Sequence, residues 1–190
     1  MVRRDRASRL RGESQDMNIR RARWEEKRPI RDFYNHLIIK NAGTIHDIGW
    51  KVDQYPSEEL LRQALERGEL YVGENNGVLV CVMILNSRGG MEYDTVHWKI
   101  SCGRDDFLVS HALGVAPEEF GKGYARQMVR FAVDTARQRQ KKAIRLDVIE
   151  GNESAARLYL EEGFEFIENI KMYYAVTGER TFGMYEYRVD

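Results

Sequence analysis

The sequence predicts one α/β or α+β domain whose sheet contains parallel strands near its middle. Three observations predict it. Two strand-like runs flank an Asn-Gly turn at residues 75–77, strand-like and helical patterns alternate from residue 107 onward, and two helical patterns precede the turn. A chain of 190 residues fits one such domain, and we expect residues 17–190 to form it.

The region before the hairpin is predicted to contain a short strand and two helices. Residues 18–23 alternate weakly, as in a strand, and residues 25–41 carry apolar side chains at helical spacing. The second helix, over residues 57–67, has clearer ends, because Ser57 can cap its start and Gly68 can end it. The apolar stripe of each helix predicts that one of its faces is buried.

A β-hairpin followed by a polar connection is predicted next along the chain. Residues 70–74 and 78–85 are predicted to be its two strands, because Asn-Gly between apolar runs is a strong signal of a tight β-turn. Residues 86–106 are a polar connection that contains glycine and one further expected strand at 96–100. Strand character resumes at residues 107–115.

The second half of the chain alternates between helices and strands. This order is typical of a sheet with parallel neighbours, since each helix lets the chain return to the same edge. The expected elements are a helix at 122–140, a strand at 143–149, a helix at 153–162, and strands at 164–174 and 181–189.

Residues 1–16 differ in composition from the rest. They hold five arginines and three acids but almost no large apolar side chain. The acids argue against a transit peptide, and the lack of an apolar stretch argues against a secretory signal. We expect a mobile tail, or a segment upstream of a natural start at Met17.

Composition argues against several classes of protein. Thirty basic and thirty acidic residues give a formal charge of zero, whereas a nucleic-acid-binding protein normally carries a positive excess. No apolar run approaches the roughly 20 residues that span a bilayer. The four histidines are scattered and no Cys or His pair has metal-ligand spacing, so no metal is expected. Cys81 and Cys102 are expected to be reduced, as in a cytoplasmic protein.

The most informative segment runs from Val115 to Ala125. A strand ends at Val115, Gly121 and Gly123 follow, and a helix with one apolar face begins. The first N–H groups of a helix lack acceptors and lie at its positive end, so they attract phosphate, and glycine lets the ligand approach the backbone. The spacing fits neither the dinucleotide-binding motif nor the P-loop. Taken alone, it leaves a purely structural turn as an alternative.

Residues 120–125, Phe-Gly-Lys-Gly-Tyr-Ala, resemble the pyrophosphate-binding motif [QR]-x-x-G-x-[GA] of the GCN5-related N-acetyltransferases (GNAT superfamily). Phe120 replaces the expected Gln or Arg, which removes a side-chain contact but no backbone contact. A second resemblance follows the next strand, where Asn152 precedes a helix that ends in Leu-Tyr and then Gly-Phe at residues 158–164. The two motifs occur at the separation that the family shows.

The resemblance implies a GNAT fold. Its central sheet is mixed and mostly antiparallel, with about seven strands, a splayed parallel pair and about four flanking helices. It also implies that an acetyl group is transferred from acetyl-CoA to a primary amine, without a metal.

The resemblance further implies where acetyl-CoA binds. Its pantetheine arm would pair with the splayed edge and hydrogen-bond to Asn152, and its pyrophosphate would lie on main-chain N–H groups. The residues expected at the edge are Leu113, Gly114 and Val115, and those at the pyrophosphate are Gly121, Lys122, Gly123, Tyr124, Ala125 and Arg126. Lys122, Arg126 and Arg130 can add positive charge. The alternatives are a solvated helix face for these cations and a plain helix cap for Asn152.

Tyr159 matches the general acid of the family. A phenol stays protonated at neutral pH and can protonate the departing CoA thiolate. Its alternative role is a core aromatic. Asp147 is the candidate general base, because it stands where some GNAT members carry a Glu, and Glu150 and His111 are the alternatives. A structural histidine remains an alternative for His111.

The acceptor amine is not identified by the sequence and is either a small molecule or a protein amine. By resemblance, the two helices before the hairpin wall its pocket, and a homodimer is expected. The aromatic candidates for the pocket are Trp24, Phe33, Trp50 and Tyr55, each equally suited to the core. Two other functions stay open: a CoA-sensing module without turnover, and a nucleic-acid binder that uses the arginine-rich tail.

Overall fold

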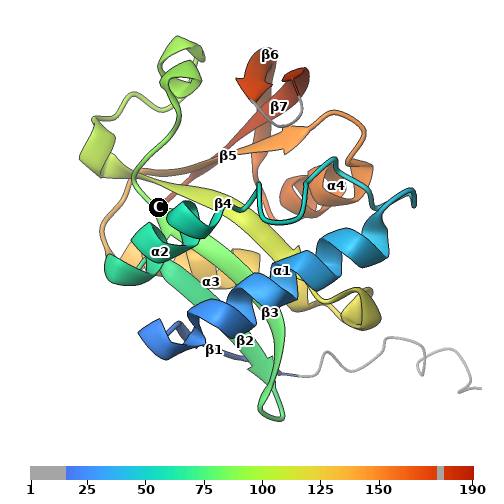
Figure 1. Ribbon diagram of the computed structural model, residues 1–190. Helices are drawn as coiled ribbons and strands as arrows, with labels where there is room; N and C mark the ends of the chain where they lie inside the picture. The colour runs from blue at the N-terminus through green and yellow to red at the C-terminus, as the bar shows by residue number, and fades with distance from the viewer. Residues whose placement is uncertain (1–15, 175–177) are drawn as a thin grey trace, which may run out of the picture.

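The computed structural model describes residues 16–174 and 178–190. They form a seven-stranded sheet in the order β1-β2-β3-β4-β5-β7-β6, flanked by four α-helices (Figure 1). The strands are β1 (Asn18–Arg21), β2 (Leu70–Asn75), β3 (Val78–Asn86), β4 (Phe107–Val115), β5 (Ala143–Ile149), β6 (Glu165–Tyr174) and β7 (Gly178–Arg188). The helices are α1 (Lys27–Asn41), α2 (Glu58–Glu66), α3 (Tyr124–Gln138) and α4 (Glu153–Glu161).

Within this described part, β4 and β5 are the one parallel pair, and all other neighbours run antiparallel. The expected mixed, mostly antiparallel sheet is therefore confirmed. The expected β-turn is present as well. Asn76 and Gly77 have φ angles of 49° and 76°, and Asn75 pairs with Val78. Positive φ at both central residues matches the right-handed twist of the two strands.

The sheet is covered on both faces, and β3 shows why its sequence is continuously apolar. Val82 and Ile84 pack against α1 and α2, whereas Cys81, Met83 and Leu85 pack against the layer that contains α3 and α4. In Figure 1, α1 crosses the near face of the sheet and α3 lies behind it. A strand that is buried on both faces has no solvent side on which to place polar residues.

The parallel pair is joined over only part of its length. Residues 107–109 of β4 pair with residues 143–145 of β5, and the pairing ends there. Farther along β4, Ala112 has a φ of 50°, and the register against β3 shifts between Val82 and Ile84. This is a β-bulge, which bends a strand and redirects its side chains. The buried Tyr34 hydroxyl donates a hydrogen bond of 2.6 Å to the Ala112 carbonyl and so holds the bulge.

The expected strand at 96–100 is wrong. Residues 86–106 form an irregular segment with short 3-10 turns at Met91–Thr95 and Arg104–Asp106. Carboxylates take the place of a neighbouring strand: the backbone N–H groups of His97 and Ile100 donate to Glu168 and Glu186 at 2.6 and 3.0 Å. The β propensity of this short apolar stretch is thus overridden by long-range hydrogen bonds.

The described chain begins beside β2. Met17 packs over Gly73, where a Cβ would lie 2.1 Å from the Met17 sulfur, and its backbone N–H donates to Gln127. The tail predicted over residues 1–16 lies outside the described residues except for Asp16, so it stays a prediction. None of the described helices combines the length and apolar character needed to cross a membrane.

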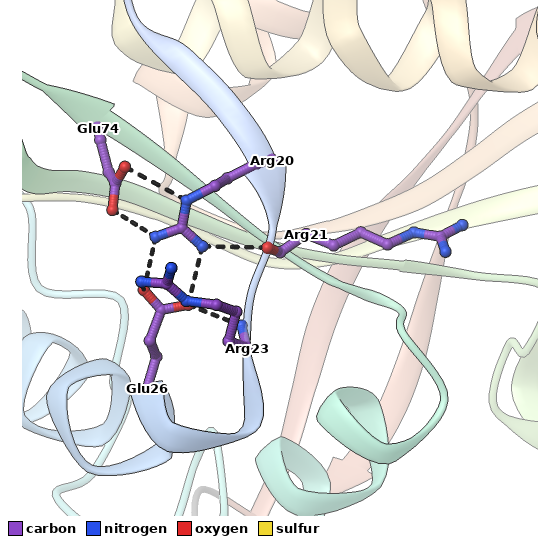
Figure 2. Close-up of polar contacts among 5 residues, drawn as sticks. All are labelled: Arg20, Arg21, Arg23, Glu26 and Glu74. Atoms are coloured by element: carbon purple, nitrogen blue, oxygen red, sulfur yellow. Dashed lines mark hydrogen bonds and ion pairs between the residues drawn. The ribbon is translucent and has the colours of Figure 1, made fainter.

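Figure 2 shows the ion-pair cluster that fastens β1. The Arg20 guanidinium lies between Glu26 and Glu74, with its Nη2 atom 2.5 Å from an oxygen of each carboxylate. Arg20 also donates to the Arg21 carbonyl at 3.1 Å. The hydrogen bonds from Arg20 are the main cause that lowers the pKa of Glu26 to about 2.

Replacing Arg20 by Met is expected to lower the free energy of unfolding by about 1–2 kcal/mol at pH 7, because the partly buried carboxylates of Glu26 and Glu74 then lose the guanidinium that lies between them. Since the Glu26 pKa is depressed in the folded state, its contribution is present above about pH 4.5 and is lost as the pH falls toward 2. Urea denaturation at several pH values should therefore show the difference between wild type and variant shrinking in acid.

The control is Arg62→Met, which removes a guanidinium that pairs with Glu59 and Glu66 on the exposed face of α2. It should cost less, because exposed pairs of this kind are screened by solvent. An equal loss for the two variants, or a difference independent of pH, would contradict this role for Arg20.

Candidate functional site

A cavity of about 500 Å³ lies where β4 leads into α3. It reaches from the end of α1 past the first turn of α3 to α4. The site residues predicted from sequence that line it are Leu113, Gly114, Val115, Gly121, Gly123, Tyr124, Ala125, Arg126, Asn152 and Tyr159. Lys122 is the predicted pyrophosphate contact that does not line it.

The first turn of α3 presents main-chain donors at this cavity. Gly121 and Gly123 have φ angles of 79° and 84°, and no side chain caps the helix. Within the described residues, the N–H groups of Gly123, Ala125 and Arg126 have no protein acceptor. A Cβ on Gly121 would meet nothing within 4 Å, so the space beside its backbone is open. The geometry matches the predicted anion-binding turn.

Gly114 has a different role. A Cβ there would lie 3.0 Å from the Leu37 side chain and 3.3 Å from the Tyr34 ring. The glycine therefore lets α1 pack closely over β4, beside the bulge. This close contact sets one wall of the cavity, since Leu37 also lines it.

A second cavity, of about 250 Å³, adjoins the first. It lies between the segment that connects α1 to α2 and the splayed ends of β4 and β5. The residues common to the linings of both cavities are Ile48, Trp50, Leu113, Asn152, Ala155 and Tyr159. The two cavities thus meet at the gap between the parallel strands.

His111 and Asp147 face the second cavity together. Each lies two residues beyond the last strand pair, Val109 with Arg145, and therefore on the same face of the sheet. The Asp147 carboxylate accepts a hydrogen bond of 2.6 Å from the Tyr93 hydroxyl, and burial raises its pKa. His111 Nε2 donates to the Arg88 carbonyl at 2.8 Å, and burial lowers its pKa. The neutral imidazole then keeps Nδ1 as its basic nitrogen.

Tyr159 enters the gap from the other face. It is 7% exposed and packs against the rings of Phe164 and Tyr185. Its hydroxyl hydrogen-bonds with the Ser110 side chain on β4, and burial raises its pKa above the usual value for tyrosine. The phenol is therefore protonated at neutral pH, and it lies where both cavities meet.

The sequence profile described as the Acetyltransferase (GNAT) family matches residues 21–166. The chain belongs to this family. The match includes the predicted anion-binding turn and Tyr159, and it ends within β6. No curated protein matches the sequence.

Solved structures support the GNAT fold. A GNAT acetyltransferase from Streptococcus agalactiae has a TM-score of 0.76 at 20% identity, with 94% of this chain and 98% of that chain covered. A Salmonella typhimurium protein solved with acetyl-CoA has a TM-score of 0.64 at 20% identity, covering 92% and 95%. A ribosomal-protein-alanine N-acetyltransferase from Brucella melitensis has a TM-score of 0.63 at 16% identity, covering 90% and 99%. At these identities the similarity shows the fold.

The cations expected near the GNAT pyrophosphate are engaged with acids in the structure. Lys122 pairs with Glu119 at 2.8 Å. Arg126, which lines the larger cavity, pairs with Glu161 at 2.5 Å and Glu162 at 2.7 Å. Arg130, about one turn further along α3, pairs with Glu162 at 2.7 Å. The hydrogen-bond donors that this turn offers to an anion are therefore main-chain N–H groups rather than unpaired cationic side chains.

Phe120, the departure from the GNAT motif, also lines the larger cavity. Its ring lies edge-on to His46, with the centroids 4.9 Å apart. Asn152 lines both cavities and caps α4, since its Oδ1 accepts from the Ala155 N–H at 3.3 Å. The two roles expected for Asn152 are thus compatible in one position.

The aromatic residues proposed for the acceptor pocket separate into two groups. Trp50 and Tyr55, on the α1–α2 connection, line the smaller cavity. Trp24 and Phe33 do not, because Trp24 is half exposed beside Lys27 and Phe33 packs from α1 into the core. The connection, rather than the two helices, forms this wall.

The three candidate general bases differ in whether they line the smaller cavity. Asp147 and His111 line the smaller cavity, whereas Glu150 is exposed and lines neither cavity. Sequence reasoning missed Ser110 and Tyr93, which bond to Tyr159 and Asp147. No local pattern distinguishes these two hydroxyls from others in the chain. Among the described residues, no group of three His, Cys, Asp or Glu side chains is arranged to hold a metal ion.

Proposed function

We propose that this GNAT protein transfers the acetyl group of acetyl-CoA to the nitrogen of an amine, with Tyr159 as the general acid. One observation carries the proposal: the buried Tyr159 phenol, whose pKa is raised by burial, lies where the larger cavity meets a smaller cavity that contains two candidate bases. In the proposed arrangement, the larger cavity takes acetyl-CoA and the smaller one takes the amine.

The residues of the cleft fit acetyl-CoA. The N–H groups of Gly123, Ala125 and Arg126 are donors for a pyrophosphate, and the open space beside Gly121 leaves room for it. Beyond the bulge, residues 113–115 line the cleft and can face an extended pantetheine arm. Acetyl-CoA, as cosubstrate, supplies the acetyl thioester.

Two proton transfers balance the reaction. A neutral amine nitrogen forms a bond to the thioester carbonyl carbon, the carbon–sulfur bond breaks, the nitrogen releases a proton and the sulfur takes one. In the proposed mechanism, Asp147 or His111 receives the nitrogen's proton and Tyr159 supplies the sulfur's proton, and all three line the smaller cavity. The products are the acetylated amine and the CoA thiol.

The experiment combines calorimetry with a thiol assay. Titrating acetyl-CoA into the protein is expected to release binding heat, and adding a panel of amines is expected to release free thiol and acetylated amine. Absence of binding heat would overturn the proposal. Binding without thiol release across the panel would instead favour a CoA-sensing module. The sequence feature that favours such a module is Phe120, which stands where the GNAT motif has Gln or Arg.

A further inference from the structure

We infer that the acceptor is a small amine with one positive charge and no anionic group. The inference rests on the proposed function and concerns the charges around the smaller cavity. Its lining contains one carboxylate, Asp147, and one imidazole, His111. The described part of its lining contains no lysine or arginine.

An acceptor with a carboxylate or phosphate would find no cation in this cavity. Two arginines lie close to the lining residues. Arg88, whose carbonyl accepts from His111, pairs with Glu69, and the buried Arg145, two residues before Asp147, pairs with Glu186 at 3.0 Å. The Arg145 guanidinium also lies over the Trp98 and Phe107 rings, with its Cζ atom 4.5 and 4.3 Å from their centroids, and these contacts hold it in place. An anionic group would therefore be desolvated without a partner and would face Asp147, and both effects oppose binding.

A second positive charge on the acceptor would be unpaired as well. Asp147 is the single acid of the described lining, and its other neighbour in the cavity, His111, has a lowered pKa and is neutral. One ammonium group can approach Asp147 and give up its proton there. A distal ammonium of a diamine would instead lie against apolar walls.

The walls fit a compact apolar body. Val148, Ile149 and Phe182 line the sheet side, and Trp50 and Tyr55 line the other side. The ring centroids of Trp50 and Tyr55 are 5.2 Å apart, and the centroids of Trp50 and Tyr34 are 6.1 Å apart. At about 250 Å³, the cavity is at the small end of ligand sites.

The wall formed by the α1–α2 connection is held to α1. The Asn35 amide donates to the Asp53 carboxylate at 3.0 Å, in addition to the contact between Trp50 and Tyr34. This wall lies on the side of the cavity opposite the sheet and is formed by Trp50, Gln54 and Tyr55. The space of about 250 Å³ between this wall and the sheet has the size of a small molecule.

The test uses pairs of amines that differ by one charge. Phenethylamine and phenylalanine differ by a carboxylate, and butylamine and 1,4-diaminobutane differ by a second ammonium. We expect kcat/KM for each monoamine to exceed that of its partner by about tenfold or more. The same order is expected for binding to the CoA-loaded protein by calorimetry, which does not depend on turnover.

A neutral lining residue allows a cation to be introduced as a control. Gln54 is exposed on the α1–α2 connection and lines the cavity. Gln54→Arg places a cation there and should reduce the preference for phenethylamine over phenylalanine by about tenfold. Gln54→Met, of similar length but uncharged, should leave that preference unchanged.

The outcomes separate this inference from the proposed function. If acetyl-CoA binds but phenylalanine or 1,4-diaminobutane is the better acceptor, or only a peptide amine is acetylated, the inferred acceptor class is wrong and the transferase remains. Binding of acetyl-CoA with no acetylation of any monoamine also overturns the class. Failure to bind acetyl-CoA overturns the proposed function itself.

Discussion

Replacing Tyr159 by Phe is expected to lower kcat by about 10²- to 10⁴-fold, while the dissociation constant for acetyl-CoA changes by less than about twofold. The physical reason is that Phe keeps the ring contacts with Phe164 and Tyr185 and removes only the hydroxyl that hydrogen-bonds with Ser110. The departing thiolate then lacks its proton donor. Steady-state thiol release and calorimetry measure the two effects separately.

Tyr185→Phe is the matched control. Tyr185 is buried to the same 7% exposure as Tyr159 and contacts its ring, but it lines neither cavity. We expect this variant to keep kcat within about threefold of wild type. Unchanged turnover in Tyr159→Phe, or equal losses in both variants, would remove Tyr159 from the chemical step.

Replacing Gly121 by Ala is expected to weaken acetyl-CoA binding by about 10- to 100-fold, the effect of one methyl group in a close-fitting site. Gly121 has a φ of 79°, its Cβ position meets no protein atom within 4 Å, and the residue lines the larger cavity. The added methyl group would therefore lie beside the N–H groups that are proposed to hold the pyrophosphate. Calorimetric titration measures the loss.

Gly77→Ala separates this effect from backbone strain. Gly77 has a φ of 76° and equally open surroundings, but it lies in the β2–β3 turn and lines neither cavity. Both variants should lose about 1 kcal/mol of stability, because alanine is strained at positive φ. Only Gly121→Ala should weaken cofactor binding. Equal affinities in the two variants would show that the turn does not hold the pyrophosphate.

Most secondary structure was predictable because it depends on neighbouring residues. The cap at Ser57 is present, with its side chain accepting from the Leu60 N–H at 3.1 Å, and the Asn-Gly turn has the expected φ angles. The expected strand at 96–100 failed for the opposite reason. Its backbone N–H groups are satisfied by Glu168 and Glu186, which lie about 70 to 90 residues later in the chain.

The candidate site was predictable in part. Its motifs indicated the residues around the larger cavity, because the geometry of a strand, a glycine turn and a helix is local. The partners of Arg126 and Arg130 were not predictable, since Glu161 and Glu162 reach them from α4. The acceptor wall was likewise assigned to the helices rather than to the connection between them.

The sequence by itself determined the family, the order of the elements and the anion-binding turn, because each follows from a short pattern of residues. Tertiary structure alone decided that His111 and Asp147 line the same smaller cavity, whose described lining contains no lysine or arginine. It also decided that Tyr159 reaches this cavity through the gap between the diverging strands β4 and β5. The reason is that a cavity and its charge are properties of the space between distant segments, which packing creates and no local pattern encodes.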